Sequence, residues 1–400
     1  MERSLTILSK LNKHLVANYE PQLIADHGSG AWLWDVDGNK YFDFLGSYAV
    51  LNIGHCHPRI IAAIKKQLDK LGLVSRTTPT EALALFSEKL VHFCGFGETG
   101  KILPALGGHE AVEKAIKIAR KWGYETKGID EKKAEIISCI GSFHGRTYGA
   151  LSLMTNQQYK YNFGPFLPGF IQIPFGDIGA LEQAITKNTA AFIVEPIQGE
   201  GGVIVPPSRY LPLVSEICRE NGVLFIADEI QTGFGRTGHN LSCERVKVQP
   251  DIFIVGKGFS GGVEPVSAVV GRAEIMDVIK KGDDGSTFAG NPLSCVAALE
   301  AMKILEEEEL SDNAYDLGLI LKQGLRNISR RYIKEVRGRG LMIGVELVEN
   351  VKTENLIRKF MAEGILLGAS HNVLRFNPPL NIGREDIYWA LPKIKKVLES

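Results

Sequence analysis

The chain has 400 residues and carries 46 basic and 46 acidic side chains, so its formal net charge at pH 7 is zero. This balance provides no strongly basic surface for nucleic acid or an anionic membrane, and we expect the partner to be a small molecule. The six cysteines are scattered without a CxxC pair, and no signal peptide or run of about 18 apolar residues is present. These features favour a cytoplasmic protein, and the length predicts a large domain with a smaller one.

After a short polar lead, the first 50 residues predict part of the smaller domain. Asp37-Gly38 is a hairpin-type turn between two aromatic-rich strands in AWLWDVDGNKYFDF. The triplet 55–57, His-Cys-His, follows. Three adjacent side chains cannot all turn toward one ion, and no further ligand cluster accompanies them, so we expect no metal site. Pro58 then begins a helix, because proline suits the first helical position.

Two glycines precede the next amphipathic helix. Gly107 and Gly108 come directly before HEAVEKAIKIARKWG, in which apolar residues recur at helical spacing. Free N–H groups at such a helix start, together with the helix dipole, can hold a phosphate. Taken alone this is a weak signal, since many helices start after glycine.

Buried strands are predicted at 135–140 and 190–194, and the second ends in Glu195 with Glu200 five positions later. Two carboxylates at this spacing are compatible with the acid and base of a glycosidase, but nothing else in the sequence supports sugar hydrolysis. A helix at 208–221 then crosses over to the next strand and completes a βαβ unit. The middle of the chain therefore predicts a parallel sheet.

Two apolar runs, at 223–227 and 251–255, have the length and composition of fully buried parallel strands. The first leads into Asp228 and the second into Lys257, which lies between two glycines. Ligands of open α/β sheets bind outside the carboxyl ends of the strands. A lysine in such an uncrowded position can form a Schiff base with a bound carbonyl, and a carboxylate facing a pyridine nitrogen is the second requirement of pyridoxal phosphate chemistry. An isolated pair of such charges is more commonly a solvated loop feature, so the surrounding sequence decides.

The surrounding string IADEIQTGFGRTG, followed by PDI and GKGFSGG, resembles the signature of class III (fold type I) aminotransferases that depend on pyridoxal 5'-phosphate (PLP). Connecting stretches such as ARKWGYETKGI and GPFLPGF are most similar to the ornithine aminotransferase family. The resemblance covers nearly the whole chain and implies an α/β fold. A large PLP-binding domain with a mostly parallel sheet would span residues 51–308, and both chain ends, 1–50 and 309–400, would form a smaller α+β domain.

The resemblance also implies roles for individual residues. Lys257 would hold PLP and act as the catalytic acid and base, while Asp228 would keep the ring nitrogen protonated. The other implied cofactor-binding residues are Gly107, Gly108 and His109 at the phosphate, Phe143 against the ring, Glu195, Gln231 at the ring 3-oxygen, and Ser286 and Thr287 from the neighbouring subunit of a homodimer with shared active sites.

Four substrate-binding residues are implied by the same likeness: Tyr48, Arg146, Glu200 and Arg375. A guanidinium fork binds a carboxylate bidentately, so Arg375 would hold the α-carboxylate of an oxo acid, and Glu200 would pair with it. The implied reaction moves the terminal amino group of ornithine, or of a similar amino acid, to 2-oxoglutarate, giving a semialdehyde and glutamate. Acetylornithine or 4-aminobutyrate as the donor, and PLP-dependent racemisation, are alternatives. Without the resemblance, Tyr48 would be interpreted as a core aromatic and Arg146 as a surface charge.

Three departures from the family pattern bear on the substrate. Gly107 stands where a serine or threonine is usual, which removes one hydroxyl from the predicted phosphate site. The segment 75–79, SRTTP, lacks the aromatic residues expected after its Ser-Arg pair, and with them a substrate-gating tyrosine. Glu264 replaces an aromatic before Pro265, and a carboxylate there would favour a cationic substrate end if it faced the pocket.

Overall fold

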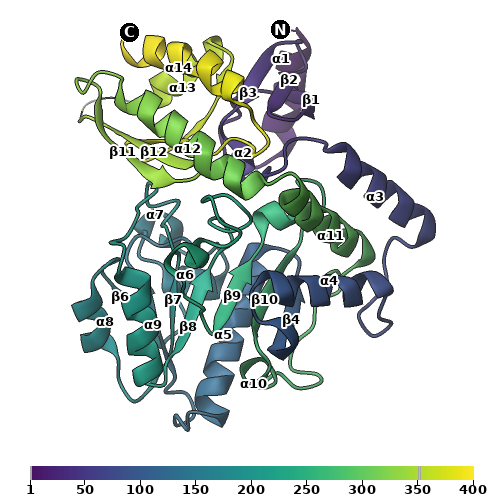
Figure 1. Ribbon diagram of the computed structural model, residues 1–400, viewed down its shortest axis with the longest axis vertical. Coiled ribbons are helices and arrows are strands. Elements are labelled where there is room, and N and C mark those ends of the chain that lie inside the picture. Colours follow the sequence, from purple (N-terminus) through teal and green to yellow (C-terminus); the bar gives the residue numbers. More distant parts are fainter. Residues whose placement is uncertain (1, 350, 352) are drawn as a thin grey trace.

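The computed structural model describes residues 2–349, 351 and 353–400. Its largest sheet has seven strands in the order β4-β10-β9-β8-β7-β5-β6 (Figure 1). β10 runs antiparallel to both of its neighbours, and the remaining pairs are parallel. The strands are β4 (Gly100–Ala105), β5 (Glu135–Cys139), β6 (Phe170–Ile173), β7 (Thr189–Val194), β8 (Leu224–Asp228), β9 (Ile252–Val255) and β10 (Ser267–Arg272). This mostly parallel sheet confirms the predicted α/β class.

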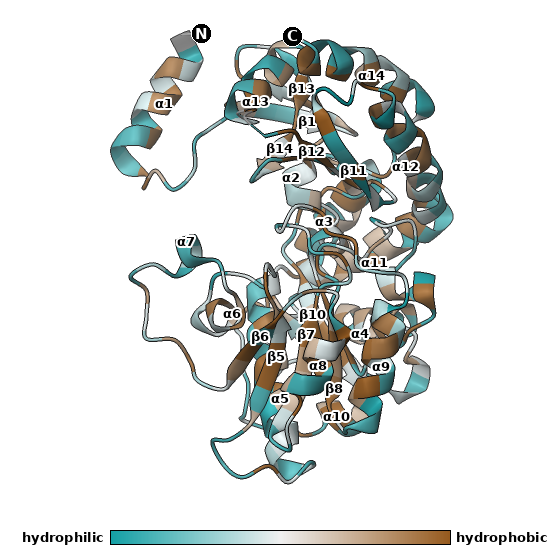
Figure 2. Ribbon diagram, turned by 90° about the vertical axis from the view of Figure 1, so that its left-hand side faces the viewer, coloured by the Kyte–Doolittle hydropathy of each residue, from teal (hydrophilic) through white to brown (hydrophobic). Residues whose placement is uncertain are grey.

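Alternate residues of the central strands enter two separate apolar clusters. Leu224 and Ile226 pack in the cluster that includes the buried face of α5 (Gly108–Glu125). Phe225 and Ala227 belong to the opposite cluster, which α9 (Tyr210–Glu220) and α11 (Pro292–Glu307) share. Burial on both faces explains why these strands are continuous apolar runs instead of alternating ones, and they are coloured mainly brown in Figure 2.

The two ends of the chain meet in a second part of the molecule with two four-stranded sheets, ordered β1-β2-β3-β13 and β11-β12-β15-β14. β13 pairs in parallel with β3, so strands more than 300 residues apart share one sheet. These strands are β1 (Ala25–Ser29), β2 (Trp32–Asp35), β3 (Lys40–Asp43), β11 (Ile333–Arg339), β12 (Met342–Leu347), β13 (Ile365–Leu366), β14 (Gly368–Ser370) and β15 (Val373–Phe376). We call this part the small lobe and the part around the seven-stranded sheet the large lobe. The predicted domain limits at residues 50 and 308 stay predictions.

The remaining helices lie around these sheets (Figure 1). They are α1 (Glu2–His14), α2 (Gly46–Ala49), α3 (Pro58–Lys70), α4 (Glu81–Phe93), α6 (Tyr148–Leu153), α7 (Gln157–Lys160), α8 (Ile178–Ala184), α10 (Ala273–Met276), α12 (Leu310–Arg326), α13 (Thr353–Ala362) and α14 (Arg384–Leu398). Pro58 begins α3 as predicted, whereas α1 occupies the stretch for which the sequence predicts a polar lead. None of the helices in the described part of the chain has the length and apolar character needed to cross a bilayer.

Arg236, in the segment after β8, joins the two lobes. Its side chain is fully buried and donates to the carbonyls of Leu341 at 3.0 Å and Pro378 at 2.6 Å, and to Oδ1 of Asn52 at 2.7 Å. Burial lowers the pKa of Arg236 to about 9. Because Leu341 and Pro378 flank strands of the small lobe, this side chain fixes the small lobe against the loop that follows Asp228.

Candidate active site

A cavity of about 340 Å³ lies at the carboxyl ends of the parallel strands. Most of the predicted site residues line it, although they come from segments more than 100 residues apart. The lining residues are Tyr19, Gly108, His109, Phe143, His144, Gly145, Arg146, Glu195, Glu200, Asp228, Ile230, Gln231, Thr232 and Lys257. The cavity therefore occupies the position that open α/β sheets use for ligands.

Lys257 begins a 3-10 turn directly after β9, with a left-handed φ of 48°. Its side chain faces the cavity, and desolvation lowers the pKa of its amine to about 8. Packing favours glycine after it, because a Cβ at Gly258 would lie 2.7 Å from Nδ2 of Asn52. A lysine whose pKa lies this close to neutrality is available as an unprotonated amine, which suits a nucleophile or a base.

Asp228, the last residue of β8, is 3% exposed and is held from two sides. Nδ1 of His144 lies 2.7 Å from Oδ2 of Asp228, and the backbone N–H of Ile230 donates to Oδ1 at 3.1 Å. Burial alone would lower the pKa of His144, but the Asp228 carboxylate outweighs it and the pKa is raised. These two contacts therefore fix the orientation of the Asp228 carboxylate at the floor of the cavity.

Glu195 directly follows β7 and holds two loop segments that border the cavity. Its carboxylate accepts the backbone N–H groups of Phe143 at 2.9 Å and Gly199 at 3.3 Å. Burial raises the pKa of Glu195 to about 7. The bonds place the Phe143 ring at the cavity edge, 5.9 Å from the ring of Tyr159, over which the Arg146 guanidinium also lies at 4.3 Å.

Glu200 and Arg375 form an ion pair across the two lobes. The Arg375 side chain is 3% exposed and that of Glu200 22%. Burial raises the pKa of Glu200, but the charge of Arg375 outweighs it and the pKa lies below its usual value. The guanidinium also lies 5.6 Å from the ring of Tyr48. Arg375 and Tyr48 therefore lie beside the cavity and not in its lining. Arg375 is connected to the lining through its ion pair with Glu200.

Tyr48 owes its position to an unusual backbone. Ser47, Tyr48 and Ala49 all have left-handed φ angles, of 49°, 60° and 66°. Such a run is strained for residues with side chains and persists where the surroundings enforce it. Gly46 precedes it, and a Cβ at Gly46 would lie 2.3 Å from the carbonyl oxygen of Asn377, so only glycine fits.

The start of α5 borders the cavity, and its role as a phosphate cradle stays a prediction. Gly107 is its N-cap residue, and Gly108 and His109 line the cavity. A Cβ at Gly107 would lie 2.8 Å from Cε1 of His109, so the imidazole fills the space where a serine or threonine side chain would stand. The absence of a hydroxyl residue at 107 is thus linked to the histidine two positions later.

Comparison with known proteins fits this geometry. The model of the family described as aminotransferase class-III matches residues 15–398. The chain is a class III aminotransferase. It is 46% identical to the ornithine aminotransferase of Bacillus subtilis (strain 168), in an alignment that covers 100% of this chain and 99% of that protein.

Solved structures of the same class superpose closely on this aminotransferase. A crystal structure of the ornithine aminotransferase from Toxoplasma gondii ME49 gives a TM-score of 0.96 at 42% identity, over 98% of this chain and 94% of that one. The acetylornithine aminotransferase from Elizabethkingia anophelis gives 0.89 at 41% identity, over 98% of both chains. These likenesses confirm the predicted family and fold.

Ser286 and Thr287 do not line the cavity of their own chain. Thr287 is exposed, and Ser286 is hydrogen-bonded to Glu110 on the first turn of α5. Their loop is anchored to α5 by Asp284, which lies 2.8 Å from Nζ of Lys114. Their contribution to the site of a neighbouring subunit stays a prediction.

Five residues that line the cavity of this aminotransferase were not predicted as site residues from the sequence: Tyr19, His144, Gly145, Ile230 and Thr232. His144 stands inside the segment GSFHGRTYGALS, next to Phe143, and its position beside a predicted site residue was the signal that could have identified it. Tyr19 follows the helix α1 and is 65% exposed, and the sequence around it shows no motif. Glu264 is partly buried, which raises its pKa, and is not among the cavity-lining residues.

Proposed function

We propose that this aminotransferase uses PLP to transfer the terminal amino group of L-ornithine to 2-oxoglutarate, giving a semialdehyde and glutamate. The observation that carries the proposal is the meeting of Lys257, Asp228 and the Glu200–Arg375 pair at one cavity. The relatives named ornithine aminotransferase support the choice of donor. Acetylornithine and 4-aminobutyrate are the alternative donors that the experiment below compares.

The residues around the cavity fit PLP. Lys257 offers a desolvated amine, and Asp228 offers a charged carboxylate that can face a ring nitrogen. Phe143 provides an aromatic wall. Gly108 and His109, at the start of α5, also line the cavity, and the free N–H groups of a helix start can hold a phosphate. When bound, PLP would supply the electron sink that stabilises negative charge on the substrate carbon.

Lys257 is the residue that moves protons in this proposal. With a pKa of about 8, its amine can take a proton from the substrate carbon and return it at physiological pH. Asp228 is held in position by His144, whose Nδ1 lies 2.7 Å from Oδ2 of Asp228. The two groups thus have separate tasks: Lys257 exchanges the proton, and Asp228 provides a carboxylate in a fixed orientation.

The Glu200–Arg375 pair lets one cavity accept two unlike substrates. Ornithine places its terminal amine at the reacting position and its carboxylate far away, so a free arginine beside the cofactor would have no partner. 2-Oxoglutarate brings an α-carboxylate to that position, where an arginine is needed. We propose that Glu200 neutralises Arg375 in the first case and releases it in the second, while Tyr48 and Arg146 hold the distal carboxylates.

We further propose a cytoplasmic homodimer in which Ser286 and Thr287 complete the phosphate site of the partner. The exposure of Thr287 and the anchoring of its loop to α5 support a role outside its own cavity. The six cysteines, all of them free, are compatible with a reducing compartment.

The function is tested by incubating the enzyme with 2-oxoglutarate and one amine donor at a time. L-Ornithine should yield glutamate at a higher kcat/KM than N-acetylornithine or 4-aminobutyrate. Faster glutamate formation from either of these would reassign the donor. Formation of D-ornithine from L-ornithine without glutamate would instead establish a racemase, because the Lys257–Asp228 pair serves both reactions.

A further inference from the structure

A second cavity, of about 320 Å³, lies between the lobes and away from the residues that line the catalytic cavity. Its walls come from α12 and β11 of the small lobe and from the 3-10 turn Ser242–Val246 of the large lobe. Five cationic side chains stand in these walls: Arg245, Lys322, Arg326, Arg337 and Arg339. We call this cavity the cationic pocket.

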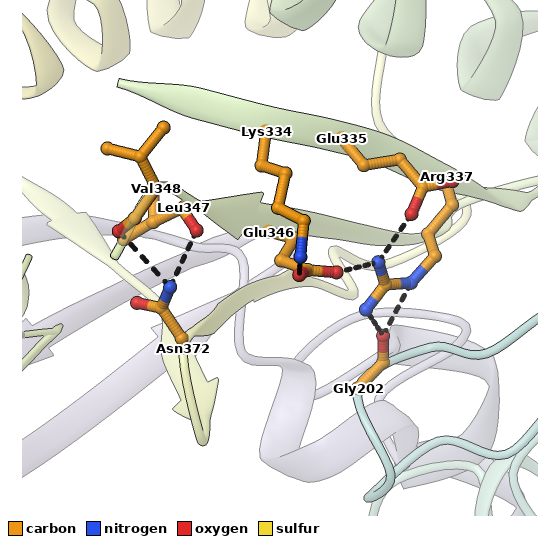
Figure 3. Close-up of polar contacts among 8 residues, drawn as sticks. All are labelled: Gly202, Lys334, Glu335, Arg337, Glu346, Leu347, Val348 and Asn372. Carbon is orange, nitrogen blue, oxygen red and sulfur yellow. Dashed lines mark hydrogen bonds and ion pairs between the residues drawn. The ribbon is translucent and has the colours of Figure 1, made fainter. Parts of the chain in front are cut away.

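One of the five cations is neutralised by the protein itself. Arg337 forms ion pairs with Glu335 and Glu346, and its guanidinium also donates to the carbonyl of Gly202 at 2.8 and 3.0 Å (Figure 3). The charge of Arg337 is therefore already neutralised within the protein. Glu335, a carboxylate in the pocket wall, is the partner of Arg337.

The other four cations have no such neutralisation. In the described ranges of the chain, Arg245, Lys322, Arg326 and Arg339 form no ion pair with a carboxylate. Lys322 donates to the carbonyl of Gly338 at 3.1 Å and Arg326 to that of Val336 at 3.3 Å, which are neutral acceptors. Four positive charges thus converge on one cavity, and none of the four is ion-paired to a carboxylate among the residues that the structure describes.

This convergence is unfavourable in the folded protein. Burial, together with the charges of Arg326, Arg245 and Arg339, lowers the pKa of Lys322. Burial and the charge of Arg245 likewise lower the pKa of Arg339. Like charges this close destabilise one another unless an anion stands between them.

We propose that the cationic pocket binds a compact polyanion carrying at least two phosphate groups. Arginine and lysine side chains are well suited to bind phosphate oxygens. Four positive charges are neutralised better by a ligand with several negative charges than by one carboxylate. A volume of about 320 Å³ accommodates a diphosphate with its water. The half-exposed ring of Tyr315 and the side chain of Leu319 add an apolar wall that an organic diphosphate can use.

The ligand would bridge the lobes. Arg245 belongs to the large lobe, whereas Lys322, Arg326 and Arg339 belong to the small lobe. Arg337, in the same wall, contacts Gly202, two residues beyond Glu200 of the catalytic pair. An anion bound here would therefore stabilise the relative position of the two lobes in which Glu200 and Arg375 form their ion pair. The binding itself does not depend on which amine the enzyme transfers.

The test is isothermal titration of the holoenzyme with sodium pyrophosphate at low ionic strength. Wild type should bind one pyrophosphate per chain, and Lys322→Ala and Arg339→Ala should each weaken binding by about tenfold or more, as expected for loss of a charge-assisted hydrogen bond. Lys322→Arg, which keeps the charge, should retain binding, and so should Lys66→Ala, which removes an exposed cation on α3. ADP should compete with pyrophosphate.

Several outcomes would overturn the proposal. One is the absence of binding to wild type, and another is unchanged binding in both alanine variants with wild-type thermal unfolding. Binding that is lost in Arg375→Ala and kept in Lys322→Ala would locate the anion in the catalytic cavity. Equal affinity for citrate and pyrophosphate would contradict the choice of phosphate.

Discussion

Replacing Glu200 with alanine should shift the preference of the enzyme between its two amine donors from ornithine toward glutamate. Glu200 is the ion-pair partner of Arg375, whose side chain is 3% exposed. Without it, the guanidinium stays free beside the reacting position in both half-reactions. It should then favour glutamate, whose α-carboxylate it can bind, over ornithine, which has no carboxylate there.

The size of the effect follows from the burial of the pair. Removing one member of a buried ion pair costs about 3–5 kcal/mol. Because the Glu200 side chain is 22% exposed, solvent screening reduces this figure, and we take about 1.5–3 kcal/mol. At about 1.4 kcal/mol for each factor of ten, the ratio of kcat/KM for glutamate over ornithine should rise about 10- to 100-fold.

Single-turnover kinetics of the holoenzyme with each donor measure this ratio directly. Glu200→Gln keeps the shape and removes only the charge, so it should give most of the effect. The pKa of Glu200 lies below its usual value, so the wild-type pair is intact at neutral pH and is lost as the pH falls through that lowered pKa. A ratio within about twofold of wild type in both variants would refute the switch and leave Glu200 a structural role.

Three further changes have expected outcomes. Gly107→Ser places a Cβ 2.8 Å from the His109 ring and should weaken PLP binding to the apoprotein, as measured by absorbance titration. The second change His109→Ala should restore the affinity, and equal affinities in all variants would contradict the link between the two residues. His144→Ala removes the partner of Asp228 and should lower kcat about 10- to 100-fold with PLP still bound, and unchanged kcat would exclude the positioning role. Arg236→Leu leaves the carbonyls of Leu341 and Pro378 without their hydrogen-bond donor and should lower the free energy of unfolding in urea by about 2–4 kcal/mol. A change below about 0.5 kcal/mol would show that the contact between the lobes does not depend on Arg236.

The parallel sheet and the two central site residues were predictable because each depends on local sequence. Asp228 and Lys257 follow apolar runs too continuous for a half-exposed strand, and the rule for ligand sites in open sheets placed them together. The predicted strand at 223–227 is observed at Leu224–Asp228, one residue later, because its last residue is also paired in the ladder. The resemblance to a known family supplied the Glu200–Arg375 pair, which the structure forms.

Contacts between distant segments were not predictable in the same way. The His144–Asp228 bond joins residues 84 positions apart, and Arg236 bonds a carbonyl 142 positions away. The sequence around each residue shows no pattern that predicts its partner, because the contact forms only when the strands assemble into the sheet. The helix α1 was not predicted for a different reason: its many polar and charged residues are typical of a solvated segment.

The central claim is that Lys257 holds PLP and moves the proton during amine transfer, and replacing it tests this claim most directly. We predict that Lys257→Ala, supplied with PLP, L-ornithine and 2-oxoglutarate, forms no detectable glutamate and lacks the absorbance band of lysine-bound cofactor, while its circular dichroism matches that of wild type. Glutamate formation at the wild-type rate by the purified variant would contradict the account.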